Sequence, residues 1–190
     1  MGDRQIILAS ASPRRREILQ SNGFDFEVVP ADVDESAIVE KSPKRLTMAL
    51  SRAKAEAIDA KKSSIVIGAD TVVVYKGRVF GKPHTVENAI ATLEKLCGRW
   101  HKVYTGVTVL CEGKRICFAV RSRVKLKAFC KVEIIKYVED TNPLDKAGAY
   151  GIQDGRIVEK YEGSYTNIVG LPMEKLAKVL ARFGVTNGNG

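Results

Sequence analysis

The sequence of 190 residues is poor in the side chains that build most metal centres and disulfide frameworks. It has four cysteines and two histidines. No two cysteines stand in a C-x-x-C pair, which excludes zinc-ribbon spacing and a thioredoxin-type site. With only His84 and His101 present, a histidine-based metal site is not expected. Any bound metal should therefore be a hard cation held by carboxylates and ligand oxygens.

Long apolar runs are also missing from the sequence. The longest, residues 64–75, is interrupted by Asp70 and falls short of the ~20 residues that a transmembrane helix requires. The first residues lack the pattern of a signal peptide, so we expect a cytoplasmic protein that does not span a membrane. Repeats, low-complexity segments and linkers are absent as well. The length and this uniformity predict one domain over residues 1–185 and a flexible tail over 186–190.

Positive charge is what the sequence has in excess, with 31 Lys+Arg against 22 Asp+Glu and a net charge of +9. Nine basic and two acidic residues lie between positions 101 and 136, where Arg121, Arg123, Lys125 and Lys127 alternate with other residues as on a strand with one basic face. This face is either a solvated surface that resists edge pairing or a surface for polyanions. No aromatic residues interleave with the charges, so nucleic acid is not the partner we expect.

The order of strand and helix patterns predicts an α/β protein with a mixed, strongly twisted sheet and flanking helices. In the second helix, Leu46, Leu50, Ala53 and Ala57 form an apolar stripe that is expected to face the core. Helices are predicted over residues 13–22, 43–60, 86–96, 132–139 and 172–183, and strands over 5–9, 26–30, 64–69, 71–75, 103–111 and 115–127.

The segment around the first predicted helix is the first candidate binding site. Ser12 followed by Pro13 signals a helix start. The three arginines Arg14 to Arg16 then occupy the first turn, where the helix dipole is already positive. A bound anion such as phosphate would explain them, and Ser10 would add a hydroxyl to the same loop. The alternative is that the arginines extend into solvent or pair with nearby acids.

Carboxylates form the second candidate group. Asp70 ends a buried apolar run, and we expect it at the C-terminal end of a central strand, where α/β proteins place ligand-facing groups. It would serve as a general base or a Mg²⁺ ligand, or it would only cap a loop. Asp32, Asp34 and Glu35 form a cluster that is either a metal-binding group or a solvated turn. Lys54 borders the apolar stripe, which predicts a partly buried stem and a directed ammonium group.

Three further residues have side chains suited to a nucleotide. Lys82 lies in the stiff Gly-Lys-Pro turn and would contact phosphate or only solvent. Thr71 places a hydroxyl beside Asp70. Gln153 ends a glycine-containing stretch that a flat ligand could approach, and its amide can both donate and accept a hydrogen bond at a base edge. This combination suits a nucleoside triphosphate and phosphoryl chemistry.

The same residues closely resemble the motifs of the Maf family, whose members are septum-formation inhibitors and nucleoside triphosphate pyrophosphatases. The resemblance implies the inosine-triphosphate-pyrophosphatase-like fold, with two lobes around a cleft. The motifs stand in the family's order as Ser10-Ala-Ser-Pro-Arg-Arg15, Gly68-Ala-Asp-Thr71, Gly81-Lys-Pro83, Asp145-Lys-Ala-Gly-Ala-Tyr-Gly-Ile-Gln153 and Val169-Gly-Leu-Pro172.

The resemblance implies hydrolysis between the α- and β-phosphates, with Mg²⁺ or Mn²⁺ as cofactor. Asp70 matches the family's proton acceptor, and Asp70 and Glu35 match carboxylates that would hold the metal. The implied catalytic residues are Asp70, Glu35, Lys54 and Lys82, and the implied substrate-binding residues are Ser10, Arg14, Arg15, Thr71 and Gln153.

The Gly-Ile-Gln ending resembles the subgroup that acts on dTTP and UTP, which implies removal of surplus or modified pyrimidine nucleotides. The alternative function is a non-catalytic regulator of cell division that binds nucleotides or nucleic acid. A homodimer is the first assembly to expect, because dimers are the commonest closed oligomers. Trp100 departs from the smaller residue that relatives often have there, and we expect it to alter the cleft wall.

Overall fold

A single twisted sheet of seven strands runs through the computed structural model, which describes residues 4–186. The strand order is β2-β1-β3-β5-β6-β7, with β4 paired to β3; β1 is parallel to β2 and β3, and the other pairs are antiparallel. The predicted tail lies outside the described residues from position 187 onward. The strands are β1 (Ile6–Leu8), β2 (Glu27–Val28), β3 (Ile65–Tyr75), β4 (Arg78–Phe80), β5 (Trp100–Cys111), β6 (Lys114–Leu126) and β7 (Val158–Glu162).

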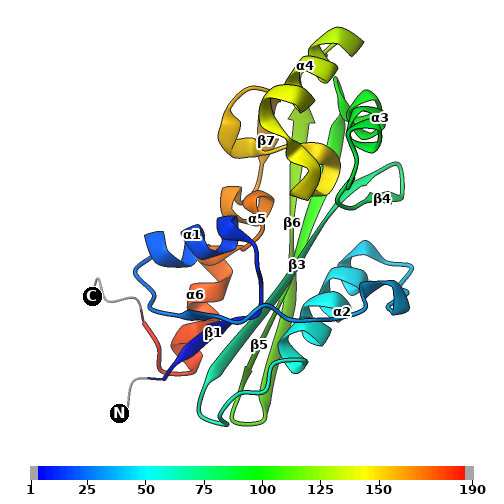
Figure 1. Cartoon of the computed structure of the whole chain (residues 1–190). Helices are drawn as coiled ribbons and strands as arrows, with labels where there is room; N and C mark the ends of the chain where they lie inside the picture. Colours follow the sequence, from blue (N-terminus) through cyan, green and yellow to red (C-terminus); the bar gives the residue numbers. More distant parts are fainter. Residues whose placement is uncertain (1–3, 187–190) are drawn as a thin grey trace.

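Helices cover both faces of this sheet, and the long strands β3, β5 and β6 run along the elongated molecule (Figure 1). The mixed sheet with flanking helices confirms the predicted α/β class. Ser12 and Ser42 occupy the N-cap positions with proline next to them, as predicted, although neither side chain makes a capping hydrogen bond within residues 4–186. The α-helices are α1 (Pro13–Ser21), α2 (Pro43–Glu56), α3 (Val86–Leu96), α4 (Lys131–Thr141), α5 (Tyr165–Val169) and α6 (Met173–Arg182), and the 3-10 helices are η1 (Glu35–Ala37), η2 (Pro143–Asp145), η3 (Ala147–Ala149) and η4 (Ile152–Asp154).

Two large hydrophobic cores lie one after the other along the long strands β3, β5 and β6, beside a small third cluster of Ile7, Ala9, Ala55 and Val66. The first packs β1, α1 and α6 against the sheet and includes Ile67, Val107 and Leu176. The second lies under α3 and α4 and includes Val73 and Leu93. Within the described residues, no helix combines the length and apolar character needed to cross a bilayer.

The predicted apolar stripe of α2 is wrong in most of its members. Leu50 is buried, but Leu46 and Ala53 are half-buried and Ala57 lies exposed beyond the helix end. The reason is that α2 rests directly on two glycines of the sheet. A Cβ atom added to Gly68 or Gly106 would lie 2.2 Å from a carbonyl oxygen of α2. This close approach selects small and hydroxyl-bearing residues for the contact face, where Thr47, Ser51 and Ala55 are buried with Leu50.

The two strands predicted over 64–69 and 71–75 form one strand, β3, and this corrects the position of Asp70. Asp70 lies in the middle of β3, not at its C-terminal end. On one side of β3, parallel pairing with β1 stops at Ile67, and antiparallel pairing with β4 begins at Val73. The edge of β3 around Asp70 is therefore left without a neighbouring strand in the described structure, and a ligand can approach it there.

The basic face predicted on β6 is confirmed, and two of its members form ion pairs with β7. Arg123 forms an ion pair with Glu162 of β7 at 2.9 Å, and Lys125 pairs with Glu159 at 3.0 Å. Arg123 also lies over the ring of Trp100, 4.7 Å from its centroid. Trp100 thus packs on this face and is not among the residues that line the cleft, so the expectation that it alters the cleft wall is wrong.

Candidate functional site

A cleft of about 750 Å³ opens beside the middle of β3, between the two halves of the molecule. One wall consists of the loop after β1, the start of α1, η1 and α2. The other consists of the loop after β4 and the segment from η2 to η4. All nine residues that the sequence assigned to the site line this cleft: Ser10, Arg14, Arg15, Glu35, Lys54, Asp70, Thr71, Lys82 and Gln153. Their individual roles stay predictions.

A lysine-bridged pair of carboxylates lies in the cleft. The ammonium group of Lys54, on α2, lies 2.7 Å from Asp70 Oδ1 and 2.8 Å from Glu35 Oε1. The side chains of Lys54 and Asp70 are 14% and 10% exposed, whereas that of Glu35 is 55% exposed. Because α2 rests on Gly68 and Gly106, the lysine reaches β3 with its stem enclosed, as the sequence predicted.

Glu35 stays ionised at this position in spite of its partial burial. Burial alone would raise the pKa of Glu35, but the hydrogen bond from Lys54 and the charges of Lys82 and Arg15 outweigh it and lower the pKa. Asp34, its neighbour in the sequence, instead accepts hydrogen bonds from Ser36 at the start of η1. Glu35 is thus the member of the predicted acidic cluster that meets Lys54, and Asp32 does not line the cleft.

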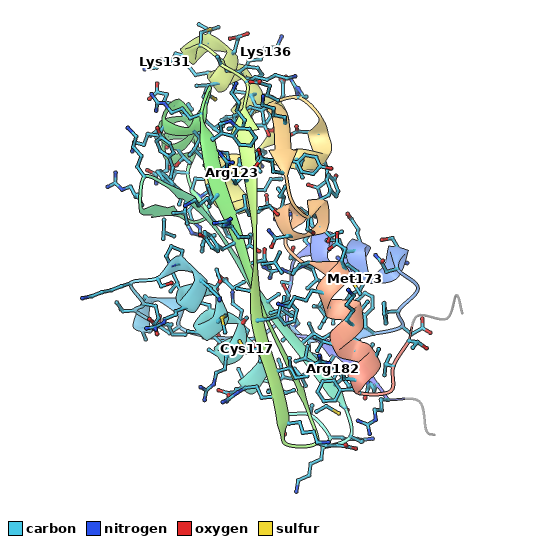
Figure 2. All side chains as sticks on the ribbon, turned by 180° about the vertical axis from the view of Figure 1, so that it is seen from behind. Cys117, Arg123, Lys131, Lys136, Met173 and Arg182 are labelled. Carbon is cyan, nitrogen blue, oxygen red and sulfur yellow. The ribbon has the colours of Figure 1, made fainter. Side chains whose placement is uncertain are left out.

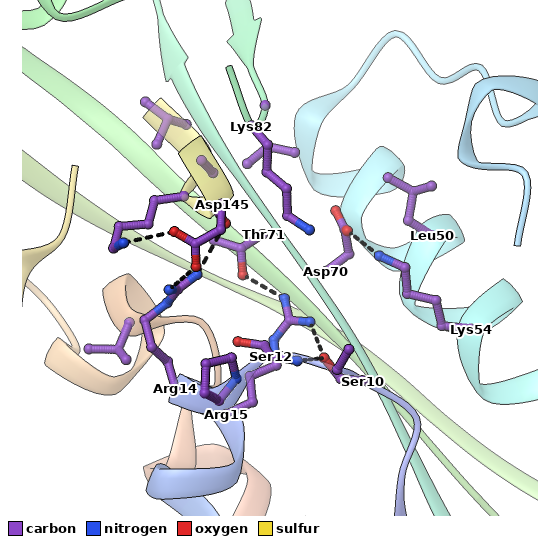
Figure 3. A pocket seen from close by; sticks show the side chains of 18 of the residues that line it. Ser10, Ser12, Arg14, Arg15, Leu50, Lys54, Asp70, Thr71, Lys82 and Asp145 are labelled. Atoms are coloured by element: carbon purple, nitrogen blue, oxygen red, sulfur yellow. Dashed lines mark hydrogen bonds and ion pairs between the residues drawn. The ribbon is translucent and has the colours of Figure 1, made fainter. Parts of the chain in front are cut away.

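The guanidinium of Arg15 forms a second part of the site. It donates to Ser10 Oγ at 2.9 Å and to Thr71 Oγ1 at 3.2 Å (Figure 3). It also donates to the carbonyl oxygen of Gly170 at 2.9 Å. Desolvation lowers the pKa of Arg15, and the nearby charge of Asp70 opposes this effect. The side chain is held by one hydrogen bond to each of three different segments, so its orientation is fixed before a ligand arrives.

A second row of hydrogen bonds holds Thr71 in place. Thr71 Oγ1 and Thr105 Oγ1 lie 3.0 Å apart, and Thr105 donates to the carbonyl oxygen of Asn167 at 2.8 Å. Thr105 and Asn167 are fully buried. The arginines at the start of α1 therefore differ in their surroundings. Arg15 is hydrogen-bonded to Ser10 and Thr71, whereas Arg16 is exposed.

Arg14 forms a contact across the cleft that the sequence did not assign. Its guanidinium donates to Asp145 Oδ2 at 2.6 Å and to the carbonyl oxygen of Asp145 at 3.2 Å, while Lys146 donates to Asp145 Oδ1 at 2.7 Å. Burial would raise the pKa of Asp145, but the hydrogen bonds from Lys146 and Arg14 lower it to about 2. Arg14 thus follows the alternative in which an arginine pairs with an acid. No local sequence signal points to it, because Arg14 and Asp145 lie 131 positions apart.

Lys82 and Gln153 are exposed on the second wall. The ammonium group of Lys82 points into the cleft between Thr71 and Asp70 (Figure 3), and it makes no hydrogen bond within residues 4–186. Gln153 lines the cleft from η4. Both side chains are thus available to a ligand that enters from solvent.

The residues present fit a magnesium ion in one particular way. The described part of the chain has no cluster of three or more His, Cys, Asp or Glu that could enclose a metal. However, Mg²⁺ commonly binds through one or two carboxylates together with substrate phosphates and water. Asp70 and Glu35 each use one oxygen for Lys54, which leaves their second oxygens for such a cation.

The fold and the site together define an α/β protein with a cleft suited to a phosphorylated, anionic ligand, because the cationic side chains of Arg15 and Lys82 line the same cleft of about 750 Å³ as Asp70 and Glu35. The chain belongs to the Maf family: the model described as "Maf-like protein" matches residues 5–183.

Relatives of this chain carry a more specific name. A protein of Thermosipho africanus (strain TCF52B) is 46% identical over 178 residues, which are 93% of this chain and 92% of the relative. A protein of Bacillus cereus (strain AH820) is 42% identical over 185 residues, 96% of this chain and 97% of the relative. Both are named dTTP/UTP pyrophosphatase.

Among solved structures, the likeness is more distant. The Ham1 protein of Staphylococcus aureus has a TM-score of 0.48 and 18% identity, covering 95% of this chain and 97% of that one. A HAM1 protein from Coxiella burnetii has a TM-score of 0.49 and 12% identity, covering 95% of this chain and all of that one. Family membership rests on the sequence match and not on these values.

Proposed function

We propose that this chain hydrolyses nucleoside triphosphates to the monophosphate and pyrophosphate, with dTTP, UTP and modified pyrimidine nucleotides as its substrates. The observation that carries the proposal is the Lys54-bridged pair of Asp70 and Glu35, which lines the same cleft as the cationic side chains of Arg15 and Lys82. The names of the two relatives support the choice of nucleotide. The cytoplasm, where nucleoside triphosphates are made, is the compartment we expect.

The triphosphate binds along the cationic part of the cleft. Arg15 presents its guanidinium, Ser10 a hydroxyl and Lys82 an ammonium group to the cleft, and such groups bind phosphate oxygens. The base lies toward the second wall, where Gln153 can donate to and accept from a pyrimidine edge.

The chemical step uses Asp70 as the general base. Its carboxylate takes a proton from a water molecule as the water oxygen forms a bond to the α-phosphorus. The bond from that phosphorus to the bridging oxygen breaks, and pyrophosphate leaves with the electron pair. Lys54 holds Asp70 in one orientation through the 2.7 Å contact. Lys82 and Arg15 balance the negative charge that develops on the leaving group.

A divalent cation, Mg²⁺ or Mn²⁺, is part of the proposal. Asp70 and Glu35 would hold it through the oxygens that Lys54 does not contact. When bound, the cation neutralises phosphate charge and makes the α-phosphorus more electrophilic. The lowered pKa of Glu35 keeps this carboxylate ionised, and thus able to bind a cation, throughout the neutral range.

The test measures pyrophosphate release from UTP, dTTP, CTP, 7-methyl-GTP and ITP with Mg²⁺ present, for the natural protein and for Asp70→Asn. We expect release from UTP and dTTP, and a loss of about 10²- to 10⁴-fold in the variant, the range for a general base. Asp59→Asn, which changes an exposed carboxylate outside the cleft, serves as the control. If Asp70→Asn releases pyrophosphate at the natural rate, Asp70 is not the general base. No release from any nucleotide would favour the non-catalytic regulator.

A further inference from the structure

The outer edge of β6 is open over most of its length. β6 pairs with β5 along almost its whole course, but β7 pairs with it only between Arg123 and Leu126. Residues 115–121 therefore have no strand on their outer side within the described part of the chain. We call this segment the open edge of β6.

The hairpin turn determines which backbone groups of the open edge are free. Glu112 and Gly113 both have positive φ, 50° and 74°, and join Cys111 to Lys114 in a two-residue hairpin loop. Cys111 and Lys114 are therefore a hydrogen-bonded pair, and every second residue after Lys114 bonds to β5. The intervening residues direct N–H and C=O away from β5, as Arg123 does toward Glu162 of β7. In the open edge these residues are Arg115, Cys117, Ala119 and Arg121.

Helices cover the two faces of the sheet here but leave the edge itself uncovered. Seen from behind, the open edge lies between α2 and α6, with Cys117 near its middle (Figure 2). Phe118 packs into the core below α6, and Cys117 contacts the carbonyl oxygen of Met48 in α2. Residues 116–120 are uncharged and all half-buried except the buried Phe118. An added strand would thus pair along an uncharged, half-buried edge.

Basic side chains flank this uncharged segment. Arg115 and Arg121 bracket it, and both are exposed. Arg115 also forms an ion pair with Glu56 at 3.0 Å, for which an acidic segment would compete. Lys175 of α6 lies over the ring of Phe118, 4.8 Å from its centroid. We propose that the open edge of β6 binds an extended acidic segment of another protein, which adds a strand to the sheet by backbone hydrogen bonds. Alternate acidic side chains of that segment would meet Arg115 and Arg121.

A second copy of this chain does not fit the same edge. Two copies related by a two-fold axis can pair their free backbone groups along the whole open edge only with Phe118 opposite Phe118. That register places Arg115 of each copy directly opposite Arg121 of the other. Like charges in directly opposed positions destabilise a sheet, and each chain also carries a net charge of +9. An acidic segment reverses both effects.

The first experiment measures amide hydrogen exchange of the full chain by NMR, with and without a capped peptide of four Glu-Val repeats. In the free protein, the outward amides of Cys117 and Ala119 should exchange fast and those of Phe118 and Val120 slowly. The peptide should slow the outward amides at least tenfold. Slow exchange of all four amides in the free protein would mean that the edge is covered, and the proposal would fail.

Two control peptides separate strand addition from simple charge attraction. A Glu-Pro repeat has the same charge but no N–H groups in its proline positions, and a Lys-Val repeat reverses the charge. Fluorescence anisotropy should show binding of the Glu-Val peptide and at least tenfold weaker binding of both controls. Equal affinity of the Glu-Pro peptide would reduce the surface to a basic patch and overturn the proposal.

A matched variant tests the edge directly. Ala119→Pro removes an outward N–H that the sheet does not use, so the fold tolerates it at an edge position. It should weaken binding of the Glu-Val peptide about tenfold and leave pyrophosphate release unchanged. If this variant does not fold, Arg115→Glu with Arg121→Glu should give the same loss. A dimer in sedimentation that either variant dissociates would show that the edge binds a second copy, contrary to the proposal.

Discussion

At the scale of single residues, Arg15 shows why charge alone does not make this site. Its three hydrogen bonds leave the guanidinium along different directions, to Ser10, Thr71 and Gly170. A lysine has the same charge, but its ammonium group cannot reach three partners in a plane. We expect Arg15→Lys to raise KM for the triphosphate about tenfold, because the lost orientation must be regained on binding.

The matched control for this prediction is Arg16→Lys. Arg16 lies in the same turn of α1, is exposed, and makes no side-chain hydrogen bond within residues 4–186. Steady-state kinetics with UTP should show an unchanged KM for the control. If both variants behave alike, the preorganisation of Arg15 has no role in binding.

Asp145 gives a prediction about pH. Its pKa is about 2 in the folded protein and close to 3.8 when it is unperturbed, so its ionised form stabilises the fold above that higher value. As the pH falls from about 4 to about 2, this contribution disappears. Half of the side chain is exposed, so solvent screens the interaction and the effect is well below what a buried pair would give.

The measurement compares urea unfolding of the natural protein and Asp145→Asn between pH 6 and pH 2. The variant should be less stable at pH 6, and the difference should shrink as the pH falls through the range from about 4 to about 2. Asp59→Asn, another exposed carboxylate, supplies the baseline. A difference that stays constant with pH would show that the stabilisation does not come from the ionised carboxylate.

At the scale of elements, the position of Lys54 depends on the contact of α2 with Gly68 and Gly106. A Cβ atom on Gly106 would lie 2.2 Å from the carbonyl oxygen of Thr47, which is backbone and cannot turn aside. We expect Gly106→Ala to destabilise the protein by about 3 kcal/mol and to lower kcat, because the helix that carries Lys54 must move.

Thermal unfolding and kinetics of the same preparation check this prediction. Gly81→Ala is the stability control, since a Cβ atom at Gly81 meets nothing within 4 Å and its backbone is in an ordinary conformation. Full stability of Gly106→Ala would mean that α2 can shift without cost, and a normal kcat would separate the position of Lys54 from catalysis.

The same contact explains what sequence patterns could and could not predict about the elements. The starts of α1 and α2 were predictable because a serine followed by proline acts locally. The buried face of α2 was not, because Thr47 and Ser51 face the sheet only where glycines of distant strands let the backbones approach. That residues 65–75 form one strand was not predictable, because the charged Asp70 interrupts the apolar pattern. The strand accommodates Asp70 because its side chain lines the cleft.

The candidate site was predictable to a different degree from residue to residue. Its nine members came from local motifs and from the family resemblance, and the fold brings them to one cleft. The link from Arg14 to Asp145 could not be read from the sequence, because it joins residues 131 positions apart. The sequence also could not show which carboxylates pair with Lys54, because Glu35 and Asp70 are likewise distant from it in the chain.

At the scale of the whole molecule, the excess of positive charge should act on the encounter with a polyanionic substrate. The net charge is +9, and salt screens such long-range attraction over about 10 Å at 0.1 M. We expect KM for UTP to rise several-fold between about 0.05 M and about 0.5 M KCl, with little change in kcat, since the contacts inside the cleft are short. Potassium glutamate in place of chloride controls for a specific anion effect. A KM for UTP that does not change with KCl concentration would show that the net charge has no role in substrate binding.

The two hydrophobic cores raise the question of whether the chain unfolds as one unit. Both cores use the same strands: Ile67 of β3 belongs to the first and Val73 of β3 to the second. Strands β5 and β6 likewise pass through both. Because neither half can lose its sheet without disrupting the other, we expect a single cooperative transition, in keeping with one domain over residues 1–185.

Trp100 makes this expectation testable, because it is the one tryptophan of the sequence and lies at the start of β5, in the half that holds α3. Leu176→Ala weakens the core at α6, in the other half, and Leu93→Ala weakens the core at α3; both side chains are fully buried. Each variant should cost about 2–5 kcal/mol. In one cooperative unit, Leu176→Ala lowers the midpoint of Trp100 fluorescence as much as that of far-UV circular dichroism. If Trp100 fluorescence keeps its natural midpoint in Leu176→Ala, the halves unfold separately and the chain has two domains.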